Sequence, residues 1–195
     1  MKKILLLFLF TFALLAGCSD DSGDNNDSNN SSDSSESNEQ SIKTDSEEKQ
    51  EDKSVYQIGE TATITSDSYD FDYEVTVTDF NLANEVNDVT IEEFIAGAGE
   101  RDKFAVVDVT IKNISDEAYV PNEMFSANFS GFDEEGGHVS IDEFFTVGDK
   151  KLEPGDELKG HLVYTTTVDY ADKFLLKYEV MSDEETHFVL PNPEM

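Results

Sequence analysis

The fold is decided by residues 101–115, which read RDKFAVVDVTIKNIS. Apolar residues occupy every second position in the middle of this stretch, and polar residues lie between them. This period of two predicts a β-strand with one buried face. The buried face comprises Ala105, Val107, Val109 and Ile111, and the other face comprises Asp108, Thr110 and Lys112. The strand ends at residues 113–116 (NISD), which form a typical turn sequence.

Short alternating segments continue on both sides of this strand. Turn sequences separate them, such as EEGG at 134–137 and EPGD at 153–156. Residues 55–195 accommodate seven to nine such strands, which predicts an all-β domain. The most economical arrangement is an immunoglobulin-like antiparallel β-sandwich, and a closed barrel is the alternative. The segments lie at residues 61–65, 73–77, 125–132, 158–164, 174–180 and 188–190.

Residues 81–100 do not follow the strand rhythm. Thr90 and Glu93 have the spacing of a capping box, in which each side chain satisfies the backbone N–H of the other residue. A short helix with an apolar stripe is therefore expected here. Either it caps an open end of the sandwich, or it forms a lobe that binds a partner. The stripe comprises Ile91, Phe94 and Ile95.

Two adjacent phenylalanines, Phe144 and Phe145, cannot both face the core of one regular strand. Either an irregular bend buries both rings, or the pair is exposed as part of a binding patch. Such a patch is the predicted ligand site, and its candidate residues are Ile91, Phe94, Ile95, Phe144 and Phe145.

Three ordered segments, 101–115, 125–137 and 152–164, resemble the telokin-like DUF4352 family. The resemblance implies an immunoglobulin-like sandwich on secreted proteins and lipoproteins, mainly of Gram-positive bacteria. It implies no agreed activity and supplies no catalytic residue. Its motif positions suggest structural roles: Gly160 permits close packing, and Asn113 bonds the backbone of its own turn.

The first 17 residues predict an export signal, with Lys2 and Lys3 before an apolar run at 4–16. That run spans roughly 20 Å as a helix, which is too short for the ~30 Å hydrocarbon layer. Residues 15–18 (LAGC) resemble the lipobox of bacterial lipoproteins. The resemblance implies cleavage between Gly17 and Cys18 and a lipid on Cys18. The protein is thus predicted to be anchored to the cell membrane on its extracytoplasmic face. The alternative is an ordinary signal peptide with a chance cysteine.

Residues 18–54 are predicted to be a disordered tether between the lipid and the domain at 55–195. Ser, Asn, Asp and Glu dominate this segment, and Ile42 is its only large apolar residue. Such a composition buries too little apolar surface to offset the entropy of ordering.

The chain has a formal net charge of −31 at pH 7, of which residues 55–195 carry −24. This charge repels nucleic acid, so no nucleic-acid partner is expected. It either keeps the protein soluble or attracts a cationic ligand. Asp67, Asp70 and Asp72 form a candidate Ca²⁺ site, with solvated turn residues as the alternative.

The sequence predicts no enzyme and no cofactor. Its single cysteine, Cys18, lies at the proposed anchor, and no catalytic motif includes any of the three histidines, His138, His161 and His187. The favoured function is a non-enzymatic surface module that binds a protein, a peptide or a cell-wall component. The alternatives are a cation-binding surface protein and an extracellular hydrolase whose site is assembled only in space.

Overall fold

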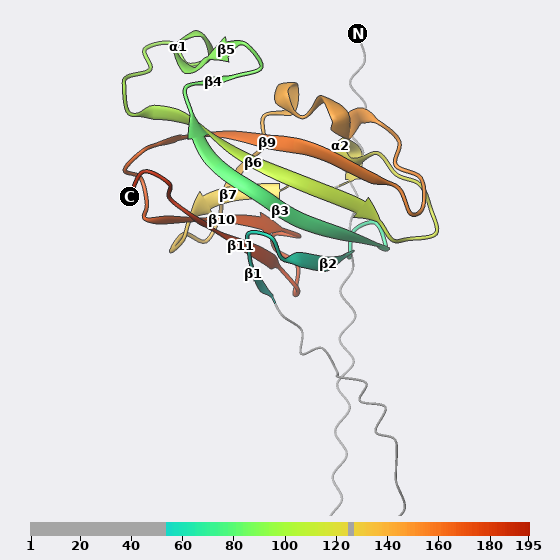
Figure 1. The fold of residues 1–195 in the computed structure, drawn as a ribbon. Coiled ribbons are helices and arrows are strands. Elements are labelled where there is room, and N and C mark those ends of the chain that lie inside the picture. Colours follow the sequence, from blue (N-terminus) through green and yellow to red (C-terminus); the bar gives the residue numbers. More distant parts are fainter. Residues whose placement is uncertain (1–53, 125–126) are drawn as a thin grey trace, which may run out of the picture. The chain divides into compact units, whose positions relative to one another are not determined.

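Two β-sheets packed face to face form most of the computed structural model, which describes residues 54–124 and 127–195 (Figure 1). The strand order is β1-β11-β10-β7-β8 in one sheet and β2-β3-β6-β9 in the other. The predicted sandwich is confirmed, and the closed barrel is wrong. The predicted signal at 1–17, cleavage site at Gly17 and Cys18, and tether at 18–54 lie outside the described residues, apart from Ser54. No helix in the described part of the chain is long and apolar enough to cross a bilayer.

The elements follow one another in the order of their labels, with a short two-stranded hairpin, β4-β5, beside the two main sheets. Their bounds are β1 Val55–Gln57, β2 Thr61–Ser66, β3 Phe71–Ala83, β4 Glu85–Val86, β5 Val89–Thr90, α1 Ile91–Phe94, β6 Asp102–Asn113, α2 Pro121–Met124, β7 Ala127–Gly131, β8 His138–Val139, η1 Asp142–Phe144, η2 Thr146–Asp149, β9 Glu157–Thr167, β10 Lys173–Tyr178 and β11 Thr186–Pro191.

One strand pair departs from the expected antiparallel pattern. β1 runs parallel to β11, with Val55 opposite His187 and Gln57 opposite Val189. The N–H of His187 also donates to the carbonyl of Ser54 at 2.8 Å. The first strand of the domain is therefore held against the last one, at the edge of the five-stranded sheet.

The main core lies between the two sheets. The predicted inner face of β6 is buried throughout, from Ala105 to Ile111, which confirms the alternation. Opposite it, the ring of Phe129 stacks between two others, with centroid distances of 5.0 Å to Tyr164 and 4.9 Å to Phe174. Aromatic packing of this kind fills the space between sheets with large apolar groups.

A second apolar cluster covers the outer face of the four-stranded sheet at one end. Phe104 and Val106 lie on the side of β6 opposite the main core, and both are buried. Residues 84–98 cover them, and α1 begins with the predicted capping box. The expectation of a helix over an open end of the sandwich is therefore wrong, because the apolar side chains that need cover lie on the outer face of the sheet. Its buried members are Val86, Ile91, Phe104, Val106, Phe144 and Val163.

The adjacent phenylalanines are both buried because their segment wraps around the edge of β9. Phe144 belongs to the second cluster and Phe145 to the main core. Between β8 and β9 the chain forms two short 3₁₀ turns, and the N–H of Ile141 donates to the carbonyl of Val163 in β9 at 2.8 Å. The predicted irregular bend is confirmed.

The turn after β6 is built as its sequence predicts. Asn113 is fully buried, and its Oδ1 accepts the N–H of Ser115 at 2.9 Å. Its Nδ2 donates to the carbonyls of Glu117 at 2.7 Å and Leu152 at 3.0 Å. Gly155, with φ of 82°, donates to the carbonyl of Asn113 at 2.8 Å. A positive φ of this size favours glycine, so Pro154-Gly155 forms the turn expected of it.

Candidate functional site

Three loops meet at one end of the sandwich, and strand register brings them together. Asp102 pairs with Thr167, so the loop before β6 lies beside the loop after β9. Gly131 pairs with Phe174, so the loop after β7 lies beside the start of β10. The segment that joins β9 to β10 passes from one sheet to the other here. This end of the domain therefore presents side chains from both sheets.

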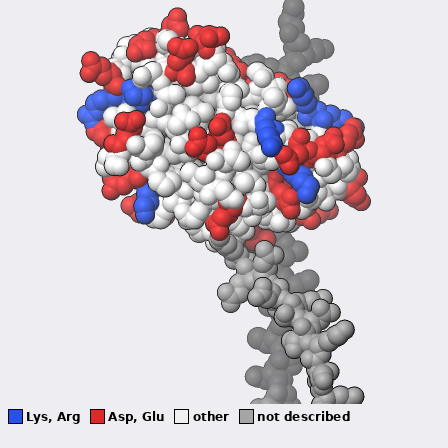
Figure 2. Space-filling model, viewed as in Figure 1, with Lys and Arg blue, Asp and Glu red and all other residues white. Residues whose placement is uncertain are grey.

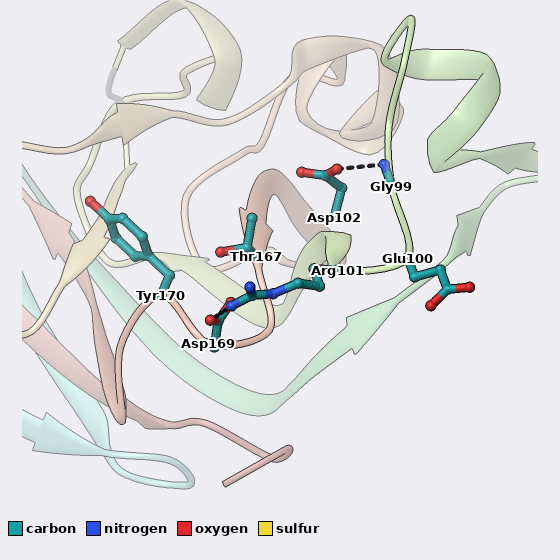
Figure 3. A pocket seen from close by; sticks show the side chains of 7 residues that line it. All are labelled: Gly99, Glu100, Arg101, Asp102, Thr167, Asp169 and Tyr170. Carbon is teal, nitrogen blue, oxygen red and sulfur yellow. Dashed lines mark hydrogen bonds and ion pairs between the residues drawn. The ribbon is translucent and has the colours of Figure 1, made fainter.

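The first part of the site is an open hollow of about 720 Å³ between the β6 and β9 ends (Figure 3). The exposed guanidinium of Arg101 forms an ion pair with Asp169, and the ring of Tyr170 stands beside them. Asp102 is turned away from Arg101, because its carboxylate accepts the N–H of Gly99 at 2.7 Å. The hollow is lined by Gly99, Glu100, Arg101, Asp102, Thr167, Asp169 and Tyr170.

A second hollow, of about 440 Å³, adjoins Tyr170 and continues toward Phe132. Tyr170 is 52% exposed and Phe132 is 45% exposed. The ammonium group of Lys173 lies 5.7 Å from the centroid of the Phe132 ring, within the range of a cation–π contact. We call the two hollows together the Tyr170 groove. The second hollow is lined by Gly131, Phe132, Asp133, Glu134, Tyr170, Ala171, Asp172 and Lys173.

Hydrogen bonds hold Tyr170 in position. Its hydroxyl donates to a carboxylate oxygen of Glu134, and the other carboxylate oxygen accepts the N–H of Gly131 at 2.9 Å. The bond from Tyr170, followed by that from Gly131, lowers the pKa of Glu134. The same bond to Glu134 raises the pKa of Tyr170. Glu134 therefore accepts both bonds as a carboxylate at neutral pH.

Buried polar side chains fasten the two loops that carry the groove. Asn192 donates from Nδ2 to the carbonyls of Val168 and Ala171, at 2.9 and 2.8 Å, on either side of Tyr170. The buried ammonium group of Lys177 donates to the carbonyls of Glu134 and Gly136. A ring held in this way loses little conformational entropy when a ligand binds.

The patch predicted from the apolar residues is not exposed as a whole. Ile91, Phe144 and Phe145 are 1%, 5% and 3% exposed, so they cannot meet a partner at the surface. They are needed to cover apolar side chains of the sheet. Of the five candidates only Phe94, which is 37% exposed, and the partly buried Ile95 reach the surface. Phe94 also contacts the rings of Phe104 and Phe144.

The predicted Ca²⁺ site is not assembled. Asp67, Asp70 and Asp72 are exposed around the β2–β3 turn, and Asp72 accepts the hydroxyl of Thr65 at 2.7 Å. Within residues 54–124 and 127–195, no three acidic, histidine or cysteine side chains converge as a metal site would require. Asp72 lies in β3 opposite Thr65, whereas Asp67 and Asp70 lie in the turn between β2 and β3.

The three histidines lie in three different strands, His138 in β8, His161 in β9 and His187 in β11. Nε2 of His161 lies 3.4 Å from Nδ2 of Asn87, and Nε2 of His187 lies 2.9 Å from a carboxylate oxygen of Glu185. His138 is exposed in β8. The bonds to Met181 N–H and then to His187 lower the pKa of Glu185.

The sequence interpretation missed the Tyr170 groove. Residues 169–172 (DYAD) place one aromatic residue in an otherwise polar turn between two strands. An aromatic side chain in such a turn has no core position available, and this signal could have marked Tyr170. Nothing local links it to Arg101 or Phe132.

The model of the family described as "Domain of unknown function (DUF4352)" matches residues 56–186. No curated protein matches the sequence. Similar solved structures include a candidate lipoprotein, ycdA, from Bacillus subtilis, with 12% identity and a TM-score of 0.44; the alignment covers 67% of this chain but only 38% of that one. A conserved hypothetical protein from Bacillus anthracis has 16% identity and a TM-score of 0.44, with 67% and 94% covered. The secreted protein MPT63 from Mycobacterium tuberculosis has 12% identity and a TM-score of 0.42, with 70% and 95% covered.

Proposed function

We propose that this chain, which belongs to the DUF4352 family, is a non-enzymatic, extracytoplasmic module. In this proposal it binds a protein or peptide in the Tyr170 groove. One observation carries the proposal: a half-exposed aromatic ring is held by its neighbours between two adjoining hollows. Loops at the end of a rigid sandwich are a common place for recognition.

The composition of the groove favours a protein or peptide ligand. Tyrosine and arginine are enriched among the residues that contribute most to protein interfaces, and Tyr170 and Arg101 line the same hollow. Phe132 adds a second exposed ring, and Lys173 adds a cation beside it. Acidic side chains surround this end, so the groove combines apolar contact with charges of both signs.

The proposed anchor is the lipid on Cys18, joined to the domain by residues 19–54. Fully extended, that segment would reach roughly 120 Å. The chain enters β1 beside His187, at the start of β11, whereas the groove borders the other end, where Pro191 pairs with Lys173. The groove therefore borders the opposite end of this sheet from the point at which the chain enters the domain.

Photo-crosslinking on intact cells tests the groove. A crosslinking amino acid at the exposed position Asp172 is expected to capture one discrete partner. The same amino acid at Met181, which is 93% exposed in a loop beyond β10, is not expected to capture it. Tyr170→Ser should abolish the product, because loss of a central ring costs about 2 kcal/mol, or roughly 30-fold in affinity. Tyr170→Phe keeps the ring but loses the hydroxyl bond to Glu134, so it should give an intermediate amount of product. A product insensitive to Tyr170→Ser would contradict the proposal.

The anchor has its own test. Cys18→Ser should release the protein into the medium or leave its signal uncleaved, because serine offers no thiol for the lipid. Ser19→Ala, one residue later, should leave the protein in the membrane fraction. Fractionation and mass spectrometry of the N-terminal peptide measure both results. An unlipidated Cys18 in the exported wild-type protein would remove the anchor from this account while leaving the groove proposal intact.

A further inference from the structure

We infer that the free edge of β2 is a second interaction surface, at which an extended lysine- or arginine-rich peptide adds as a fifth strand of the four-stranded sheet. This surface is separate from the Tyr170 groove, and it does not depend on the function proposed above. The inference rests on the open edge and on the charge around it.

The other three edges of the two main sheets are short or covered. β1 has three residues and β8 has two, so neither offers a long row of free backbone groups. The edge of β9 is covered near its middle by the segment that buries Phe144 and Phe145, through the bond from Ile141 to Val163. Natural proteins commonly shorten or cover edges in these ways, because a free edge is a template for another strand.

β2 has none of these protective features. It runs for six residues, TATITS, in unbroken register with β3, and it contains no proline and no charged residue. In the described part of the chain, the backbone of residues 61–65 makes no hydrogen bond besides its ladder with β3. Thr61, Thr63 and Thr65 are exposed on its outer face, and β-branched residues favour a pleated conformation. Strand addition at such an edge gains affinity from main-chain hydrogen bonds.

The charge around this edge selects the occupant. From Ser54 to Glu100 the sequence contains no lysine or arginine. Acidic side chains flank β2 at Glu60, before it, and at Asp67, Asp70 and Asp72, after it. Figure 2 shows acidic groups in the middle of the visible face as well as along its outline, with basic groups toward the left and right sides. A cationic peptide would meet complementary charge along β2.

A second copy of this chain is the other conceivable occupant, and charge disfavours it. A two-fold axis through paired β2 strands would bring the same acidic flanks together. Like charges placed opposite each other across paired strands are destabilising.

The first test uses a ten-residue peptide of alternating lysine and valine, carrying a fluorophore. We expect it to bind the domain, by anisotropy, and to slow hydrogen exchange of the amides in residues 61–66. The same peptide with alternate backbone nitrogens methylated should bind at least tenfold more weakly, because it cannot complete the ladder. A peptide with glutamate in place of lysine should not bind.

Matched variants locate the site. Asp67→Asn/Asp70→Asn should weaken binding about fivefold, since each exposed charge contributes a modest amount. Asparagine also tolerates the positive φ of 55° at position 70. Glu85→Gln/Glu92→Gln removes the same charge from exposed positions beyond the far end of β3 and should change binding less than twofold.

Three results would overturn the inference. Binding of the lysine peptide without protection of residues 61–66 would mean attraction to the acidic surface elsewhere. Equal binding of the methylated peptide would exclude strand addition. Protection of residues 61–66 that rises with protein concentration, without peptide, would identify a second copy as the occupant.

Discussion

Replacing Phe145 by alanine is expected to destabilise the domain by about 3–5 kcal/mol, the range for deleting a large aromatic side chain from a core. The ring is 3% exposed and belongs to the main core. Its segment covers the edge of β9, so the loss affects both the space between the sheets and the cover over that edge. An effect of this size is a large part of the stability of an ordinary domain.

Urea unfolding followed by circular dichroism measures this effect. Phe132→Ala is the matched control, because Phe132 is 45% exposed and its loss should change stability by no more than about 0.5 kcal/mol. If the two variants unfold at the same urea concentration, Phe145 does not hold the β9 edge in the way described.

Gly160→Ala is expected to cost about 1–3 kcal/mol through overpacking. A Cβ atom at position 160 would lie 2.6 Å from Cε2 of Phe145 and 2.6 Å from Cγ2 of Val147. Gly148 approaches the other edge of the same ring, where an added Cβ would lie 2.5 Å from Cδ1. The ring of Phe145 is thus confined between two glycines, and neither position has space for a methyl group.

The control is Gly136→Ala, because an added Cβ there meets nothing within 4 Å. It should change the free energy of unfolding by no more than about 0.5 kcal/mol. A double variant that combines Gly160→Ala with Phe145→Ala sharpens the test. Phe145→Ala removes the ring that the methyl group added at position 160 would strike, so the double variant should lose less than the sum of the two single losses. Strict additivity would mean that the glycine and the ring do not meet.

Local patterns predicted much of the fold correctly. The alternation in residues 101–115 identified the inner face of β6, and the turn chemistry at Asn113 and Gly155 is as expected. The capping box at Thr90 and Glu93 also forms. Each of these features depends on residues within a few positions of one another. The charge of the domain likewise follows from composition alone.

The errors concern which surface an apolar side chain covers. Phe104 and Val106 lie on the face of β6 that the alternation predicts to be polar, although both are apolar. The sequence shows that such residues need cover, but not which distant segment supplies it. In the fold, α1 and Phe144 supply it, which is why Ile91 and Phe144 are unavailable for binding a partner.

By itself the sequence determined an all-β domain, its turns and its acidity. It also predicts a lipid anchor at Cys18. Only the tertiary structure decided that Arg101, Glu134 and Tyr170 share one end of the sandwich, and that β2 is left with an open edge. The physical reason is that alternation and turn chemistry act between neighbours along the chain. A groove formed by three loops, and the choice of which strand ends a sheet, depend on pairing between strands tens of residues apart.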